Sequence, residues 1–256
     1  MTDVVTWEDG VDGVLVATMD HRPANALGAP VIDGLNAVLD EAERRETRVL
    51  VLTSAIPGFF AAGADIKHMG TVDAKSFTDY GDRLRGAVER LAGADLVSIA
   101  AVEGVALGGG MELAMACTMR VSGTEAKYGL PEVRLGLIPG AAGTQRLPRL
   151  VGRGRAIDIM ATARQVPADE AEAIGLVDRL VEAGGARDAA LELAGQLSAL
   201  SRPAVAAVLR TVDAAFDLPF PEGQRYEIEQ IQELFERGEA REGITAFLEK
   251  RAPKFA

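Results

Sequence analysis

The sequence predicts an α/β protein with a mostly parallel sheet system covered by helices, followed by a helical C-terminal region. Short apolar runs alternate with segments of helical spacing between residues 13 and 181. The apolar runs are nearly continuous, which is typical of strands buried on both faces of a parallel sheet. Beyond this alternation, prolines divide an almost wholly helical tail. These three observations favour an α/β core with a helical appendage.

The expected strands are short runs of Val, Leu, Ile and small residues. Residues 13–19 (GVLVATM) and 48–53 (RVLVLT) are almost uninterrupted in apolar character, and residues 97–102 and 118–121 continue the pattern. A further, weaker run at 176–181 precedes the tail. Because apolar and β-branched residues dominate these runs, we expect them to form the buried sheet.

The segments between the strands carry apolar residues on one helical face. Residues 29–45 and 74–91 have this spacing. On the first helix, the apolar face consists of Ile32, Leu35, Val38, Leu39 and Ala42. In the tail, prolines mark helix boundaries, because proline is tolerated only near the start of a helix. Three tail helices are therefore expected near residues 203–216, 222–236 and 239–251.

Composition bounds both the size of the core and the kind of ligand. The 256 residues suffice for one large domain or for a main domain with an appendage, and 48% of them are apolar. A formal net charge of −11 without any run of Lys or Arg excludes a general nucleic-acid binder, because phosphate affinity rests on clustered cations. An anionic ligand would need local cations such as Arg22, Lys67, Arg146 or Arg149.

Cysteine use and the first residues indicate the compartment. The single cysteine, Cys117, cannot form an internal disulfide, which fits a reducing environment. Residues 1–11 lack a basic region before an apolar stretch, and no run of about 18 apolar residues occurs, so neither a signal peptide nor a membrane span is expected. His21 and His68 lack metal-ligand spacing. We expect a soluble cytoplasmic protein that binds no metal.

Two segments rich in glycine and other small residues interrupt the alternation of strands and helices. They are residues 58–67 (GFFAAGADIK) and 104–112 (GVALGGGME). Small side chains let a ligand approach the main chain, and N–H groups at a helix start favour negative charge. Each segment alone could equally serve a tight turn. Neither matches a Walker or a G-x-G-x-x-G pattern, so nucleotide binding finds no support.

Two glutamates stand out beside these segments. Glu112 directly follows the three glycines, and Glu132 follows Pro131 among apolar residues. Glu132 is either an acid at the start of a helix or a reactive carboxyl whose pKa is raised by burial against its neighbours Val133, Leu135, Leu137 and Ile138. Two carboxyls near one anion site would suit the addition of water to a polarised double bond. Glycoside hydrolysis is disfavoured, because only 5% of residues are aromatic and sugar sites use aromatic platforms.

An ordered series of motifs resembles the enoyl-CoA hydratase/isomerase (crotonase) family. The series spans most of the chain and keeps its order and spacing, which makes the resemblance specific. It consists of Arg22-Pro23, Asn25-Ala26-Leu27, FFAAGADIK (59–67), IAAVEGVALGGGMELAMACTMRVS (99–122), YGLPEVRLGLIPGAAGTQRLPRLVG (128–152), AEAIGLVDRLV (171–181) and FLEKRAPKF (247–255). The segment HRPANAL is shorter than its counterpart in many members of the family.

The resemblance implies a crotonase-like spiral of ββα turns with a C-terminal α-helical oligomerisation region. On this basis residues 1–198 form the catalytic core that binds the CoA thioester, and residues 199–256 form a helical trimerisation region. Trimers, often paired as hexamers, are the expected assembly. An acyl-CoA thioester is the expected substrate, and no cofactor is expected, because coenzyme A is part of that substrate.

The resemblance also assigns site residues. The N–H groups of Ala64 and Gly109 would form an oxyanion hole for the thioester carbonyl. Glu112 would activate water for attack at C3, and Glu132 would donate the proton to C2. Gly140 matches a glycine on the side of the second carboxylate. The residues expected to bind substrate and CoA are Arg22, Ala24, Ala62, Ala64, Asp65, Ile66, Lys67, Gly108, Gly109 and Gly140.

Retention of both glutamates favours one reaction within the family. A hydratase uses both carboxyls, whereas a Δ3-Δ2-enoyl-CoA isomerase generally needs only the acid of the Pro-Glu motif. The sequence therefore predicts a lyase that hydrates a trans-2-enoyl-CoA to a 3-hydroxyacyl-CoA, in fatty-acid β-oxidation or related acyl-CoA breakdown. An isomerase, another CoA-thioester enzyme of the family, or a non-catalytic acyl-CoA binder are the alternatives.

Overall fold

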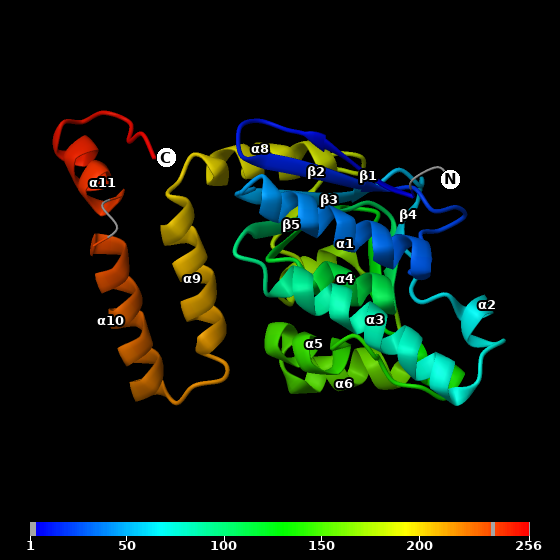
Figure 1. Cartoon of the computed structure of the whole chain (residues 1–256). Helices are drawn as coiled ribbons and strands as arrows, with labels where there is room; N and C mark the ends of the chain where they lie inside the picture. The colour runs from blue at the N-terminus through cyan, green and yellow to red at the C-terminus, as the bar shows by residue number, and fades with distance from the viewer. Residues whose placement is uncertain (1–3, 237–238, 256) are drawn as a thin grey trace.

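Two sheets form the core of the protein in the computed structural model, which describes residues 4–236 and 239–255 (Figure 1). The larger sheet has the order β1-β2-β3-β5-β7-β10 and is parallel except for the antiparallel pair β1·β2. Its strands are β1 (Val5–Asp9), β2 (Val14–Met19), β3 (Val49–Ser54), β5 (Val97–Val102), β7 (Met119–Gly123) and β10 (Arg179–Val181). The prediction of an α/β fold with a mostly parallel sheet is confirmed.

Both faces of this sheet are buried, which explains the continuous apolar runs. Alternate residues such as Leu50 and Leu52 pack with α1 (Ala29–Arg44), α3 (Ala74–Ala92) and α4 (Gly109–Ala116) in one apolar cluster. Their neighbours Val49 and Val51 pack on the opposite face against α8 (Ala186–Ser198). Because successive side chains of a strand point to opposite faces, a strand covered on both sides needs apolar residues at every position.

A smaller sheet lies next to the first and carries the glycine segments. It has the order β4-β6-β8-β9, with β4 (Phe59–Ala61), β6 (Val105–Leu107), β8 (Lys127–Gly129) and β9 (Val166–Pro167). Each of β3, β5 and β7 is followed along the chain by one strand of this sheet, and then by a helix or a helical turn. This repeat is the ββα spiral that the resemblance implies. The sequence did not reveal the small sheet, because two or three residues carry too little periodicity.

The remaining helices complete the α layer around the sheets. They are α2 (Ile66–Met69), α5 (Gly143–Val151), α6 (Arg153–Thr162) and α7 (Ala168–Ala173), and a 3₁₀ turn, η1, spans Glu132–Leu135. α1 and α3 match the expected helices within one residue at each end.

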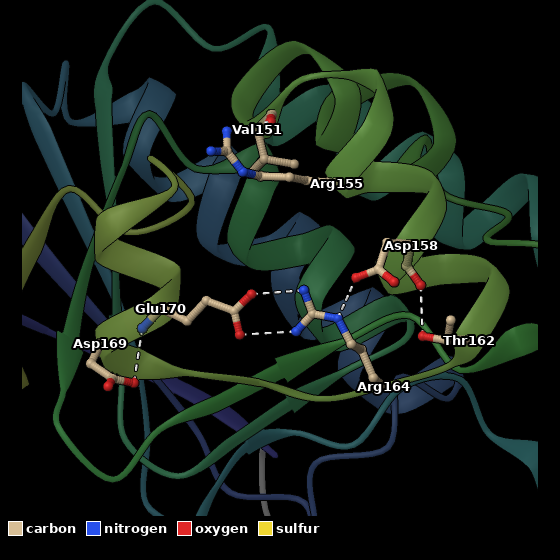
Figure 2. A network of polar contacts seen from close by, with 7 residues as sticks. All are labelled: Val151, Arg155, Asp158, Thr162, Arg164, Asp169 and Glu170. Atoms are coloured by element: carbon tan, nitrogen blue, oxygen red, sulfur yellow. Dashed lines mark hydrogen bonds and ion pairs between the residues drawn. The ribbon is translucent and has the colours of Figure 1, made fainter.

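A polar network fixes the segment between α6 and α7 (Figure 2). The guanidinium of Arg164 donates two hydrogen bonds to Glu170, at 2.9 and 2.7 Å, and one to Asp158 at 2.6 Å. Two parallel bonds to one carboxylate impose a defined orientation on both partners. The network thereby joins the segments on either side of β9, and β9 pairs with β8, whose last residue, Gly129, lies three residues before Glu132.

Of the C-terminal helices, the first packs against the edge of the core through Val205 and Leu209, and the last two stand away from the sheets (Figure 1). In chain order they are α9 (Arg202–Ala214), α10 (Phe220–Glu236) and α11 (Glu239–Leu248), close to the three helices expected for the tail. Large apolar side chains on them are exposed, including Val208, Val212, Phe216, Phe220, Ile231, Phe235, Phe247 and Leu248. No helix within the described ranges is both long and apolar enough to cross a membrane.

A buried asparagine joins the loop after β2 to three strands. Asn25 is fully buried with a φ of 51°, a left-handed conformation that asparagine tolerates better than most residues. Its amide donates to the Phe60 carbonyl at 3.0 Å, to Ser54 Oγ at 2.7 Å and to the Met19 carbonyl at 3.4 Å. Its Oδ1 accepts from the N–H of His21 at 2.7 Å. Asn25 therefore holds residues 21–27 against β2, β3 and β4.

Replacing this side chain should destabilise the fold. We expect Asn25→Ala to lower the free energy of unfolding by about 2–4 kcal/mol, because several buried groups lose their partner and alanine disfavours the positive φ. Asn36→Ala is the matched control, since the Asn36 side chain makes one hydrogen bond, within its own helix, to the Ile32 carbonyl. Urea unfolding measures both. Equal losses in the two variants would contradict the assigned role of Asn25.

Candidate functional site

Two backbone N–H groups come together where the glycine segments meet. A Cβ built on Gly109 would lie 3.5 Å from the amide nitrogen of Ala64, so these two residues are in contact. Gly63 and Gly108 have φ values of 97° and 51°, which side chains other than glycine rarely adopt. Within residues 4–236 and 239–255, the N–H groups of Ala64 and Gly109 have no protein acceptor. The sequence-predicted pair is thus adjacent and free to bind an anionic oxygen.

The direction of the Ala64 N–H is set by the peptide to which it belongs. The carbonyl of Gly63 accepts a hydrogen bond from the N–H of Leu27 at 2.8 Å. In a planar trans peptide the C=O and N–H groups point in opposite directions. The bond from Leu27 therefore turns the Ala64 N–H away from the 21–27 loop.

Tyr80 on α3 ties the same two loops together. Its hydroxyl donates to the Leu27 carbonyl at 2.7 Å and accepts from the N–H of Asp65 at 3.0 Å. The side chain is buried, and burial raises the pKa of the phenol. The sequence analysis missed this residue, because a tyrosine on the buried face of an amphipathic helix ordinarily indicates core packing.

Glu112 is buried at the start of α4, with 2% of its surface exposed. Its Oε1 accepts from the N–H groups of Ala141 and Gly143, at 2.7 and 2.8 Å, at the N-terminus of α5. A helix N-terminus stabilises a carboxylate through its unpaired N–H groups and its dipole. Burial nevertheless dominates and raises the pKa of Glu112, against the lowering effect of these bonds and of Arg146 and Arg85. No described residue donates to Oε2.

Glu132 occupies the first position of η1, directly after Pro131. Of the two alternatives for Glu132, the position at the start of a helical turn is the one observed for its backbone. Its Oε2 is buried without a hydrogen-bond partner, and burial raises the pKa of Glu132 to about 7, with the charge of Glu112 adding to the rise. Its Oε1 lies 2.8 Å from the position that a Cβ on Gly108 would occupy. The carboxyl of Glu132 therefore lies directly over the glycine segment.

The expected cause of this burial was wrong. Leu135 and Ile138 are 54% and 70% exposed, and Val133 and Leu137 are also exposed. A 3₁₀ turn of four residues directs its side chains outward in several directions, so the apolar neighbours in sequence do not enclose the carboxyl. Glu132 as a whole is half-buried, and its Oε1 lies against Gly108 rather than against these neighbours.

The residues expected to bind substrate lie along two adjacent segments. The N–H of Ala62 donates to the Ala24 carbonyl at 2.9 Å, which places residues 22–27 beside residues 60–63. Asp65 caps α2 by accepting from the N–H of His68 at 3.0 Å. Arg22, Ile66 and Lys67 are exposed near these segments.

Gly140 lies in the turn before α5, and two N–H groups of this turn donate to Glu112. Its carbonyl accepts from Nε of Arg85 at 3.1 Å, and the following N–H, of Ala141, donates to Glu112. The sequence placed Gly140 on the side of Glu132, whereas the hydrogen bonds of this turn go to Glu112. Arg146, considered as a cation for phosphate, contacts the Ala141 carbonyl and Glu89.

Other polar residues are not gathered into a metal site. Among the described residues, no group of three or more His, Cys, Asp and Glu is placed to hold a metal ion. The ring of His21 contacts the Ala26 carbonyl, and that of His68 packs edge-on against Tyr80. Cys117 is buried, and burial raises the pKa of its thiol to about 12.

The arrangement combines a carboxyl held by two N–H groups, a second carboxyl whose Oε2 has no partner, and two N–H donors without acceptors among the described residues. Two titratable groups with different surroundings can act as acid and base in one reaction. N–H donors fixed by the fold stabilise an oxyanion because they need not reorient as charge develops. The site is therefore suited to moving protons at a substrate whose carbonyl oxygen becomes negative.

Comparisons with known proteins cover nearly the whole chain. The family model described as enoyl-CoA hydratase/isomerase matches residues 9–256. The short-chain-enoyl-CoA hydratase of Clostridium acetobutylicum is 37% identical, with 98% of this chain and 96% of that protein covered. A crystal structure of an enoyl-CoA hydratase from Bacillus anthracis superposes with a TM-score of 0.95, 31% identity and 98% coverage of both chains. Pseudomonas aeruginosa DspI gives a TM-score of 0.96 at 36% identity, over 100% and 97% of the two chains.

The unpaired Glu132 carboxyl should cost stability at alkaline pH. Its pKa of about 7 in the folded protein lies above the ordinary value of 4.5, so the penalty on stability is absent below pH 4.5, grows as pH rises, and is complete above pH 7. We expect Glu132→Gln to raise the free energy of unfolding at pH 8 by about 1–2 kcal/mol, allowing for partial exposure, and to leave it unchanged at pH 4.

The exposed Glu125 provides the control for this measurement. Urea unfolding of Glu125→Gln at both pH values should match the wild type. The raised pKa would be contradicted if the difference in unfolding free energy between Glu132→Gln and the wild type were the same at pH 8 as at pH 4.

Proposed function

The chain belongs to the enoyl-CoA hydratase/isomerase family, and we propose that it is an enoyl-CoA hydratase. It is a hydro-lyase that adds water across the 2,3-double bond of a trans-2-enoyl-CoA to give a 3-hydroxyacyl-CoA. The observation that carries the proposal is a pair of carboxyls, the buried Glu112 and the half-buried Glu132 with its buried Oε2, beside two N–H groups without acceptors among the described residues.

The N–H groups of Ala64 and Gly109 bind the thioester oxygen in this proposal. Their hydrogen bonds strengthen as negative charge moves onto that oxygen, and each donor of this kind lowers a barrier by about 3–4 kcal/mol. Withdrawal of electrons through the conjugated system makes C3 electrophilic. The fixed loops around Gly63 and Gly108 support this role, because the donors are already oriented before substrate binds.

The two glutamates divide the proton transfers. Glu112 holds water near its second oxygen and takes one proton as the water oxygen bonds to C3. The electrons of the double bond move into an enolate held by the two N–H groups. Glu132, protonated at its pKa of about 7, gives its proton to C2 as the thioester carbonyl re-forms. Transfer of the proton from Glu112 back to Glu132, directly or through solvent, restores the starting state.

Two of the alternatives fit the site less well. An isomerase that shifts a double bond needs one group to carry a proton and no second carboxyl to activate water. Here the second carboxyl, Glu112, is present and is held in a fixed position by two N–H groups, which an isomerase would not require. A carrier that only binds acyl-CoA has no use for two buried carboxyls with raised pKa values. Hydration uses both groups and both N–H donors.

Binding of CoA is proposed to involve the paired segments beside the N–H donors. Their members are Arg22, Ala24, Ala62, Asp65, Ile66 and Lys67, with Gly108 and Gly140 lining the acyl side. Coenzyme A enters as part of the substrate, and the reaction needs no further cofactor or metal. The name of the Clostridium acetobutylicum relative supports a short acyl chain, and the chemistry fits fatty-acid β-oxidation or related acyl-CoA breakdown.

Assembly is proposed to cover the apolar surfaces of α9, α10 and α11. Phe247 is 82% exposed and Phe220 is 78% exposed, and such patches mark contact surfaces. A homotrimer, or a hexamer made of two trimers, would bury them, with residues 199–256 as the trimerisation region. We place the protein in the cytoplasm, which fits its single, buried cysteine.

Removal of either carboxyl should abolish most of the hydration of crotonyl-CoA. We expect Glu112→Gln and Glu132→Gln each to lower kcat at least about 100-fold, because an amide can neither accept nor supply the proton. Loss of absorbance of the conjugated thioester measures the rate, and Glu125→Gln serves as the control. Conversion of a 3-enoyl-CoA to its 2-ene that survives in Glu112→Gln, with no hydration by the wild type, would identify an isomerase instead.

The pH dependence of kcat/KM should follow the two carboxyls. The rate should fall above pH 7 as Glu132 loses the proton it donates, and fall on the acid side as Glu112 gains a proton. Initial rates with crotonyl-CoA between pH 4.5 and pH 9 test this. A rate that stays constant from pH 6 to pH 9 would exclude Glu132 as the proton donor.

A further inference from the structure

One cation near the site is not explained by fold or by the proposed reaction. Arg85 lies on α3, and its side chain is 50% exposed. Its Nη1 forms an ion pair with Asp82 at 2.6 Å, one turn earlier on the same helix. Its Nε is directed elsewhere and donates to the carbonyl of Gly140 at 3.1 Å, 55 residues later in the chain. This half-exposed arginine thus donates one hydrogen bond to a backbone carbonyl of the turn before α5.

That carbonyl belongs to the peptide that holds Glu112. The C=O of Gly140 and the N–H of Ala141 are the two polar ends of one planar peptide and point in opposite directions. The N–H donates to Oε1 of Glu112 at 2.7 Å. Arg85 therefore donates to the carbonyl of a peptide whose N–H donates to the carboxylate of Glu112. A cation at the carbonyl also polarises the peptide, which strengthens the N–H as a donor.

The charges around Glu112 make this contact consequential. α3 contributes Arg85, with Asp82 beside it, and α5 contributes Arg146, which is paired with Glu89 of α3. η1 contributes Glu132, whose negative form opposes that of Glu112. Arg146 contacts the next carbonyl, that of Ala141, at 3.3 Å. The two arginines thus hold successive carbonyls of the turn 140–143, and only the Arg85 contact lies on a peptide that bonds to Glu112.

We infer that Arg85 is a positioning residue for Glu112, which acts through the Gly140–Ala141 peptide to fix the direction of the carboxylate and favour its charged form. The inference rests on the proposed function, because Glu112 is there the base that activates water. Arg85 touches neither water nor substrate in this scheme. Its effect should therefore appear in the chemical step and in the titration of Glu112, and not in substrate binding.

The kinetic test compares Arg85→Gln with Arg83→Gln. Arg83 lies on the same helix and pairs with Asp33, away from the turn 140–143. With crotonyl-CoA we expect Arg85→Gln to lower kcat about tenfold through misplacement of the base, with KM changed less than about twofold. The acid limb of its kcat/KM profile should move to higher pH by about half a unit. Arg83→Gln should keep the wild-type values of all three.

The lysine variant separates positioning from packing. Arg85→Lys retains a cation and a donor, and we expect it to recover most of the kcat lost in Arg85→Gln. Thermal unfolding should give similar midpoints for all variants, because both arginines are half exposed. A glutamine variant with the kcat and acid limb of Arg83→Gln, or a lysine variant no better than glutamine, would overturn the inference.

A titration without turnover separates this inference from the proposed function. In a Glu132→Gln background, infrared difference spectra follow protonation of Glu112, with Glu112→Gln/Glu132→Gln as the subtraction. We expect added Arg85→Gln to raise the pKa of Glu112 and added Arg83→Gln to leave it unchanged. An unchanged pKa with Arg85→Gln would overturn the inference. A wild-type protein that hydrates no enoyl-CoA would overturn the proposed function alone, since the infrared result stands by itself.

Discussion

Keeping an ionisable carboxyl inside the protein is the constraint on which the rest of the site depends. Glu112 is almost fully buried, and removing a carboxylate from water costs several kcal/mol unless other dipoles replace the water. The N–H groups of Ala141 and Gly143 supply that replacement at the start of α5. A Cβ on Gly143 would lie 2.9 Å from Oε1 of Glu112, so the turn must approach as closely as only glycine permits. The end of β6, the start of α4 and the start of α5 are thereby held in one arrangement.

The second carboxyl, that of Glu132, lies in the opposite kind of surroundings. The Oε2 of Glu132 meets no donor, and burial, with the charge of Glu112, raises the pKa of Glu132 to about 7. One fold thus gives two glutamates contrasting surroundings, which is how an acid and a base coexist near neutral pH. The arrangement lowers stability, since a buried unpaired carboxylate is unfavourable, and such local cost is typical of functional sites.

The sequence carried much of the fold and part of the site, for identifiable reasons. The strands of the larger sheet were visible because burial on both faces makes runs such as residues 48–53 continuously apolar. The two glutamates and the N–H pair could be singled out because glycine runs and an apolar Pro-Glu segment are local signals, although the roles assigned to them relied on resemblance. Their roles at the site remain predictions until the variants are measured.

The features that were missed depend on long-range contacts. Tyr80 meets Leu27 across 53 residues, and Arg85 meets Gly140 across 55. Neither residue differs in type or spacing from ordinary members of an amphipathic helix. A carboxyl with a raised pKa was one of two interpretations that the sequence left open for Glu132, but the apolar neighbours expected to cause the rise are exposed, and its Oε1 lies against Gly108 instead. Such contacts follow from topology, which periodicity does not encode.

Helix α3 has a consequence for motion within the site. Through Tyr80 it is fastened to the loops that carry the Ala64 N–H, and through Arg85 to the turn that grips Glu112. One helix of 19 residues thus connects the loops that carry the Ala64 and Asp65 N–H groups to the turn that donates to Glu112. A displacement of α3 would therefore move both parts of the candidate site in the same direction, so that a substitution far from the two carboxyls, on the core face of this helix, has a route to both.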